Sequence, residues 1–123
     1  MNTISEIKND IKNKNFSPIY LLMGEEEFYI DNITNLFLEN VLTEEEKQFN
    51  LNILYGKETS VDQIISVCKK YPLMSKYQIV LIKEAQDLSR TFDGLVEYFR
   101  NPLKSTILII NYLSLIHISE PTR

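Results

Sequence analysis

The sequence contains few of the residues that form disulfides and histidine-based sites. Among its 123 residues there are one cysteine, one histidine and three glycines. A single cysteine cannot form an internal disulfide, and the single histidine, His117, cannot form a metal site that needs several histidines. No apolar run is long enough to cross a bilayer, and the N-terminus has neither the basic start nor the apolar stretch of a secretory signal. We therefore expect a cytosolic protein that neither spans nor binds a membrane.

Positive charge is also scarce. Thirteen Lys and Arg residues stand against seventeen Asp and Glu residues, which gives a net charge of −4 and a pI near 5.0. Domains that bind nucleic acid through its phosphates usually carry a basic patch and have a high pI. The composition therefore disfavours autonomous binding of DNA or RNA and leaves open a contact with DNA inside a larger assembly.

The residues that are present are those of one soluble globular domain. Hydrophobic residues make up 44% of the chain and charged residues 24%, which are ordinary values for such domains. A chain of this length can bury a core without disulfides or a structural metal.

Segments with helical spacing of apolar residues alternate with short apolar runs. The predicted helices cover residues 4–13, 25–41, 61–68 and 87–100, and the predicted strands cover 19–23, 49–55, 77–82 and 106–110. Residues 43–47 are interpreted as a charged connector. The first strand is expected to be buried on both faces, and the second, which alternates with polar residues, to lie at or near a sheet edge. This alternation predicts an α/β fold with an open, mostly parallel sheet flanked by helices.

The first strand-to-helix turn is where such a fold would hold a phosphate. The turn Gly24–Asp31 has one glycine, no lysine and three adjacent carboxylates, so it lacks the residues of a phosphate-binding loop and would repel a nucleotide. The third strand runs into Lys83 and Glu84, so a lysine stands where a nucleotide hydrolase places the acid that holds magnesium. The sequence thus predicts an α/β architecture in which the position of a P-loop is degenerate, and no cofactor.

Other reactive groups have simpler interpretations. The acid clusters Glu25–Glu27 and Glu44–Glu46 are interpreted as a helix N-terminus and a solvated connector. Cys68 lies on the apolar face of its helix and is interpreted as a core residue. Because no catalytic constellation can be assembled, we expect no catalytic activity, and an enzyme such as a nucleotide hydrolase or a phospho-receiver is disfavoured.

The loop of residues 69–76 is the candidate functional segment. Leu73 and Met74 are adjacent apolar residues in a basic loop that contains a proline. Two interpretations remain open from the residues alone. Both side chains could pack into the core, or they could protrude as a plug for a pocket on a partner, with the lysines steering the loop toward an acidic surface.

Three segments, Pro18–Phe28, Pro72–Ile82 and Asn101–Ile110, occur in an order that is familiar from one family. On the basis of these three segments, residues 17–112 resemble the N-terminal domain of the delta subunit of bacterial DNA polymerase III, the clamp-loader subunit that opens the sliding clamp. That domain is similar to an AAA-plus fold that has lost its nucleotide site. The resemblance implies a sheet order of 5-1-4-3-2, with the fifth strand missing from this chain.

The resemblance also implies a site and partners. In the family, the loop before the third strand inserts an apolar pair into the sliding clamp (the beta subunit), and the matching residues here are Leu73 and Met74. The residues that flank this pair are Lys70, Tyr71, Pro72, Ser75 and Lys76. Binding would favour an open clamp ring, while other clamp-loader subunits handle ATP and DNA is held only within the assembled loader. The delta subunit would thus be a non-catalytic component of a DNA-directed DNA polymerase. The alternative is an α/β protein-interaction module with an unrelated partner.

The sequence departs from the family in two respects. Family members are longer and add a lid-like second domain and a C-terminal helical collar. Residues 113–123 resemble the translation of sequencing-adapter DNA, so we expect a clamp-binding domain over residues 1–112 and a non-native or disordered tail over 113–123.

Overall fold

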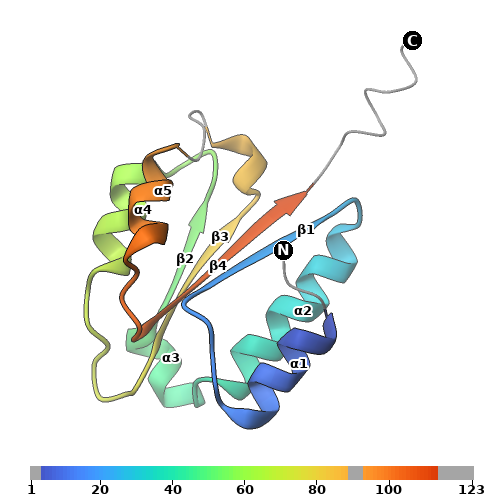
Figure 1. Ribbon diagram of the computed structural model, residues 1–123, viewed down its shortest axis with the longest axis vertical. Coiled ribbons are helices and arrows are strands. Elements are labelled where there is room, and N and C mark those ends of the chain that lie inside the picture. Colours follow the sequence, from blue (N-terminus) through green and yellow to red (C-terminus); the bar gives the residue numbers. More distant parts are fainter. Residues whose placement is uncertain (1–3, 89–92, 114–123) are drawn as a thin grey trace.

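Helices and strands alternate along most of the chain. The computed structural model describes residues 4–88 and 93–113 (Figure 1). Its helical elements are α1 (Ile4–Asn13), α2 (Glu27–Asn40), α3 (Glu44–Asn50), α4 (Val61–Cys68), the 3-10 helix η1 (Ala85–Asp87) and α5 (Asp93–Arg100). Its strands are β1 (Ile19–Gly24), β2 (Leu51–Tyr55), β3 (Gln78–Lys83) and β4 (Thr106–Leu113). Among the described residues, no helix is long and apolar enough to cross a membrane.

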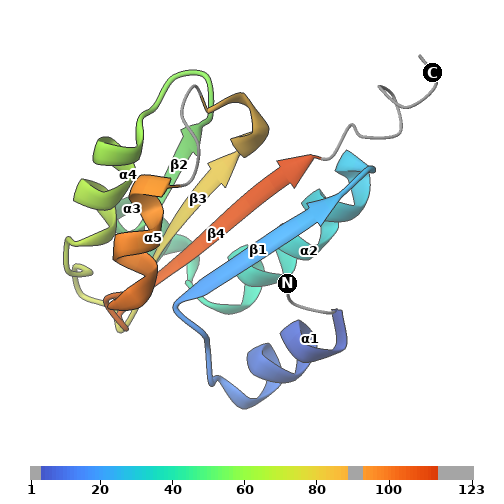
Figure 2. The same cartoon turned by 45° about the horizontal axis from the view of Figure 1, so that its top comes forward.

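The four described strands form one parallel sheet in the order β1-β4-β3-β2. β4 lies between β1 and β3, and its Leu108 pairs with Ile19 of β1 and Val80 of β3. All four carboxyl ends therefore lie at one end of the sheet (Figures 1 and 2). This topology confirms the predicted α/β class with a parallel sheet flanked by helices, and it confirms the edge position predicted for β2.

Helices cover both faces of the sheet, which explains why the central strands are continuously apolar. Ile79 and Leu81 of β3 pack with α1 and α2 in one core cluster, whereas Val80 and Ile82 pack with α4 and α5 in the other. Figure 2 shows these two helical layers on opposite sides of the strands. Since successive side chains of a strand point to opposite faces, the apolar residues of β3 and β4 alternate between the two cores.

Tyr20 anchors the first helix to the sheet. Its hydroxyl donates to the Asp10 carboxylate of α1 at 2.7 Å and accepts from the Ser17 backbone N–H at 2.9 Å. Its ring packs on Phe37 of α2, with a centroid distance of 4.6 Å. Burial, reinforced by the hydrogen bond to Asp10, raises the pKa of Tyr20 to about 12, so the phenol stays protonated at neutral pH.

The prediction that the first strand is buried on both faces is only half right. Tyr20 and Leu22 are buried beneath α1 and α2, but Ile19 and Leu21 are only partly buried on the other face, and Met23 is exposed. β1 is one of the two edge strands of the described sheet, and α4 and α5 do not cover it fully (Figure 2).

The prediction of a connector over residues 43–47 is wrong. Thr43 begins α3 with a reciprocal capping box, in which its hydroxyl accepts from the Glu46 backbone N–H at 3.1 Å and the Glu46 carboxylate accepts from the Thr43 N–H at 2.9 Å. The Glu44–Glu46 cluster is therefore the first turn of a helix. Phe49, predicted to lie in the second strand, belongs to α3 and is exposed, so β2 begins at Leu51.

Two further boundaries differ from the predictions. The helix predicted from Asp87 does not start there, because Asp87 ends η1 and Leu88 is extended, and the described helix begins at Asp93. Residues 89–92 lie outside the described residues. β4 continues to Leu113, three residues beyond the predicted strand. His117 and the rest of the tail, residues 114–123, also lie outside the described part.

Gly56 fits a close contact between two loops at the carboxyl ends of β2 and β3. Its N–H donates to the carbonyl of Lys83 at 2.9 Å, and an added Cβ would overlap the carbonyl oxygen of Glu84. Glu84 itself has the left-handed backbone conformation, with φ 53°. The backbone conformation is therefore constrained both at Gly56 and at Glu84.

We predict that Gly56→Ala lowers the free energy of unfolding by about 1–3 kcal/mol, as is typical of an atom added to a closely packed site. Urea unfolding of the 123-residue chain would measure the change. Gly24→Ala is the matched control, since a Cβ at Gly24 meets no atom within 4 Å. Equal losses in the two variants would contradict the role given to the Gly56 contact.

Candidate functional site

The predicted plug loop joins α4 to β3 at the amino end of the sheet (Figure 1). Met74 is 94% exposed, Leu73 is 60% exposed and Tyr71 is 74% exposed. The interpretation in which Leu73 and Met74 pack into the core is therefore wrong. Of the flanking residues, Lys70 and Lys76 are also exposed, whereas Pro72 and Ser75 are half-buried.

Buried polar side chains hold the base of the loop. The Gln78 amide nitrogen lies 3.1 Å from the Val67 carbonyl and 2.7 Å from the Lys70 carbonyl. It also lies 2.9 Å from the Thr106 hydroxyl, which donates to the Cys68 carbonyl at 2.7 Å. These contacts satisfy carbonyls at the end of α4 that have no partner within the helix. The loop therefore leaves α4 from a fixed point.

A second contact holds the loop at the apolar pair. The Asn50 side-chain amide donates to the Leu73 carbonyl at 2.7 Å, and its oxygen accepts from the Leu73 N–H at 2.7 Å. Asn50 is 1% exposed at the end of α3. The next residue, Met74, has φ 57°, a left-handed conformation that is unfavourable for a residue with a side chain. Sequence reasoning missed Asn50 because no local pattern marks a side chain whose partner lies 23 residues away.

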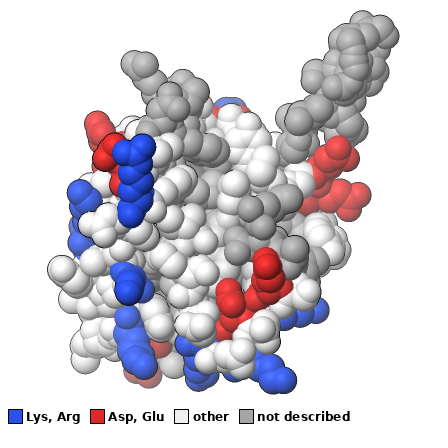
Figure 3. Space-filling model, in the orientation of Figure 1, with Lys and Arg blue, Asp and Glu red and all other residues white. Residues whose placement is uncertain are grey.

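Charge is distributed unevenly over the molecule. The exposed lysines Lys69, Lys70 and Lys76 surround the apolar pair, and Lys104 is exposed on the loop that enters β4 at the same end of the sheet. In Figure 3 basic side chains lie along the left margin of this face, on the side of α4 and α5, and others lie along its lower margin, on the side of α1. The apolar pair therefore protrudes from a basic part of the surface.

The turn at the position of a phosphate-binding loop lies at the opposite end. Glu26 is the extended residue before α2, and it makes no side-chain cap. An open groove of about 410 Å³ runs over this turn, and Glu25 and Glu26 are among the residues that line it. The structure thus places these carboxylates at the carboxyl end of β1 and the start of α2, as predicted from the sequence.

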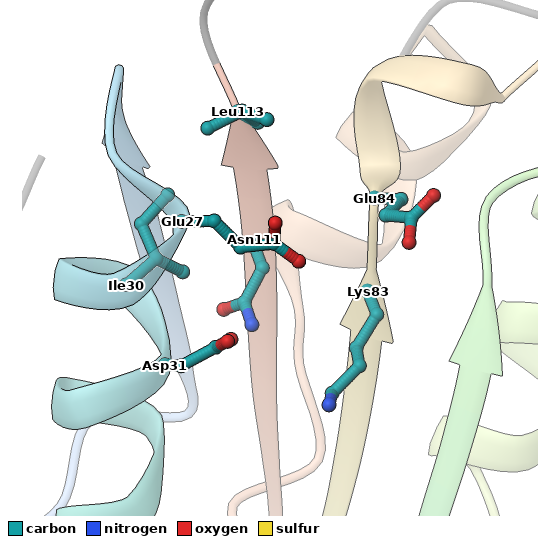
Figure 4. Close-up of a pocket in the computed structure, with 7 residues that line it drawn as sticks. All are labelled: Glu27, Ile30, Asp31, Lys83, Glu84, Asn111 and Leu113. Carbon is teal, nitrogen blue, oxygen red and sulfur yellow. The ribbon is translucent and has the colours of Figure 1, made fainter.

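A small cavity lies beside this turn, between α2 and the ends of β3 and β4. Its volume is about 30 Å³, which is room for a water molecule rather than for an organic ligand. The lining residues are Glu27, Ile30, Asp31, Lys83, Glu84, Asn111 and Leu113 (Figure 4). Lys83 approaches the cavity from β3, on the side opposite Asp31. A lysine thus occupies the position at which a nucleotide hydrolase places its magnesium-binding acid, as predicted from the sequence. No group of three or more His, Cys, Asp or Glu residues in the described ranges could hold a metal ion.

Cys68 is confirmed as a core residue. It is fully buried in the cluster that includes α4 and α5. Burial raises the pKa of its thiol to about 12, and a hydrogen bond with Tyr98 opposes this increase without cancelling it. Because the thiolate is the nucleophilic form, Cys68 is not an activated nucleophile.

The α/β fold matches that of a solved clamp-loader delta protein. It is similar to the solved DNA clamp loader delta protein of Bacillus subtilis, with a TM-score of 0.79 and 20% identity over 90% of this chain and 35% of that chain. It is also similar to a DNA polymerase III gamma subunit-related protein of Thermotoga maritima, with a TM-score of 0.61 and 11% identity over 93% of this chain and 43% of that one.

The family model for the DNA polymerase III delta subunit matches residues 20–115, which is most of the chain, and the chain belongs to this family. The DNA polymerase III subunit delta of Bacillus subtilis (strain 168) is 21% identical over 116 residues, which are 87% of this chain and 33% of that protein. The chain thus spans about a third of the length of this relative. The resemblance found in the sequence is confirmed.

We predict that the 123-residue chain shows no saturable binding of ATP with magnesium up to about 1 mM nucleotide. The reason is that the turn at the nucleotide position carries carboxylates in place of the lysine and glycines that cradle phosphates. Isothermal titration calorimetry would check this prediction. Saturable binding of ATP in the micromolar range would contradict this prediction and would support a nucleotide hydrolase instead.

Proposed function

We propose that this chain is the clamp-binding part of a clamp-loader delta subunit, and that the loop of residues 69–76 is the plug that enters the sliding clamp. The observation that carries the proposal is the exposure of Leu73 and Met74 on a loop whose backbone is tied to buried side chains. Family membership supplies the partner class.

The chemistry of the loop suits an apolar pocket on an acidic surface. Burial of two exposed apolar side chains supplies affinity, and the unbranched Met74 can adapt to the shape of a pocket. The surrounding lysines raise the rate of encounter with an acidic partner.

The action that we propose is mechanical. Binding at the plug favours a clamp conformation in which the ring is open, and this chain contributes no covalent chemistry. ATP is handled by other clamp-loader subunits, which the longer protein would contact through regions outside this chain, and DNA is held only within the assembled loader. The site of action is the bacterial cytosol.

The test is a binding titration of the full 123-residue chain with its cognate sliding clamp. We predict that Leu73→Ala combined with Met74→Ala weakens binding by about 2–4 kcal/mol, as for a pair of interface hot spots. The matched control is Phe28→Ala with Tyr29→Ala, which removes two exposed aromatic side chains at the other end of the sheet. We expect this control to change affinity by less than about twofold.

A loss of less than about twofold in the loop variant would remove Leu73 and Met74 from the site. Absence of binding by the folded wild-type chain would instead favour the alternative, an α/β interaction module with an unrelated partner.

A further inference from the structure

We infer that Asn50 is a positioning residue for clamp binding, which holds the backbone of the plug loop in its binding conformation before the partner arrives. The inference rests on the proposed function of the loop. It assigns a role in recognition to a buried side chain of α3 that does not itself protrude toward a partner.

Both polar groups of the Asn50 side chain bind one residue of the plug. The Nδ2 group donates to the Leu73 carbonyl and the Oδ1 atom accepts from the Leu73 N–H, each at 2.7 Å. Two short hydrogen bonds to the same residue fix its orientation as well as its position. Because Asn50 is 1% exposed, water does not readily replace this contact.

The loop needs such a restraint because its conformation is locally unfavourable. Met74 adopts φ 57° directly after the residue that Asn50 holds, and a non-glycine residue persists there only where its surroundings impose it. This conformation coincides with a Met74 side chain that is 94% exposed. Without the Asn50 contact, Met74 would relax to negative φ and the direction of its side chain would change.

A rigid loop binds better than a mobile one, because the entropy of ordering is lost during folding and not again on binding. Asn50 thus acts on affinity through conformation. This distinguishes it from Leu73 and Met74, which in the proposed function touch the partner, and from Gln78, which holds only the base of the loop.

The first measurement uses the wild-type chain and needs no substitution. We expect the Leu73 amide to exchange its hydrogen at least about tenfold more slowly than the Met74 amide, because Asn50 accepts from the former. Equal exchange at the two amides would overturn the inference.

The second measurement compares clamp affinities by titration. We expect Asn50→Ala to weaken binding of the cognate sliding clamp about tenfold and to abolish the slow exchange at Leu73, while amides of β3 such as that of Val80 stay protected. The control is Thr34→Val, which removes a buried hydroxyl that contacts Ile30 and Asn111, far from the loop. We expect this control to bind as the wild type does.

The outcomes separate this inference from the proposed function. Equal loss of affinity in Asn50→Ala and Thr34→Val would show a general effect on stability and overturn the positioning role. If the wild-type chain binds the clamp and Asn50→Ala binds it equally well, the positioning role of Asn50 is overturned and the proposed function stands. A wild-type chain that does not bind the clamp would overturn the proposed function, and this inference with it.

Discussion

The pairing of β4 with both β1 and β3 is the constraint on which the rest of the structure depends. Because β4 and β3 are covered by helices on both faces, nearly every one of their side chains must be apolar or satisfied internally. Their parallel registers then fix the ends of all four strands. The acid-rich turn and the loop of residues 69–76 lie at opposite ends of the sheet for this reason, since the turn follows β1 and the loop precedes β3.

Three buried polar side chains lie at the amino end of the sheet, where loops must be held. Gln78 and Thr106 are the first residues of β3 and β4, and they satisfy the carbonyls at the end of α4. Asn50, the last residue of α3, continues the same pattern at Leu73. Burial makes each of these hydrogen bonds costly to lose, so the segment before β3 is ordered although its apolar side chains face outward.

The sequence predicted the sheet better than it predicted the connections. Continuous apolar runs identified β3 and β4 because both faces of these strands are covered, and the alternation around Asn52 placed β2 at an edge. The helix α3 was missed because its charged first turn was interpreted as a connector, and the capping box of Thr43 and Glu46, which marks the start of the helix, was not used. At Leu88 the spacing fits a helix, but the chain is extended there after η1.

For the candidate site, composition located the loop of residues 69–76 but left its exposure open, because two apolar residues in a loop are compatible with either burial or protrusion. Tertiary hydrogen bonds decide between these states, and they come from residues distant in the chain. The proposed plug is therefore encoded in two places, its side chains at Leu73 and Met74 and its shape at Asn50. A linear peptide with the sequence of residues 69–76 would have these side chains but would lack the backbone conformation that Asn50 imposes on the loop. A competitor based on this loop would therefore have to be cyclised, so that the ring restrains the backbone in place of the Asn50 amide.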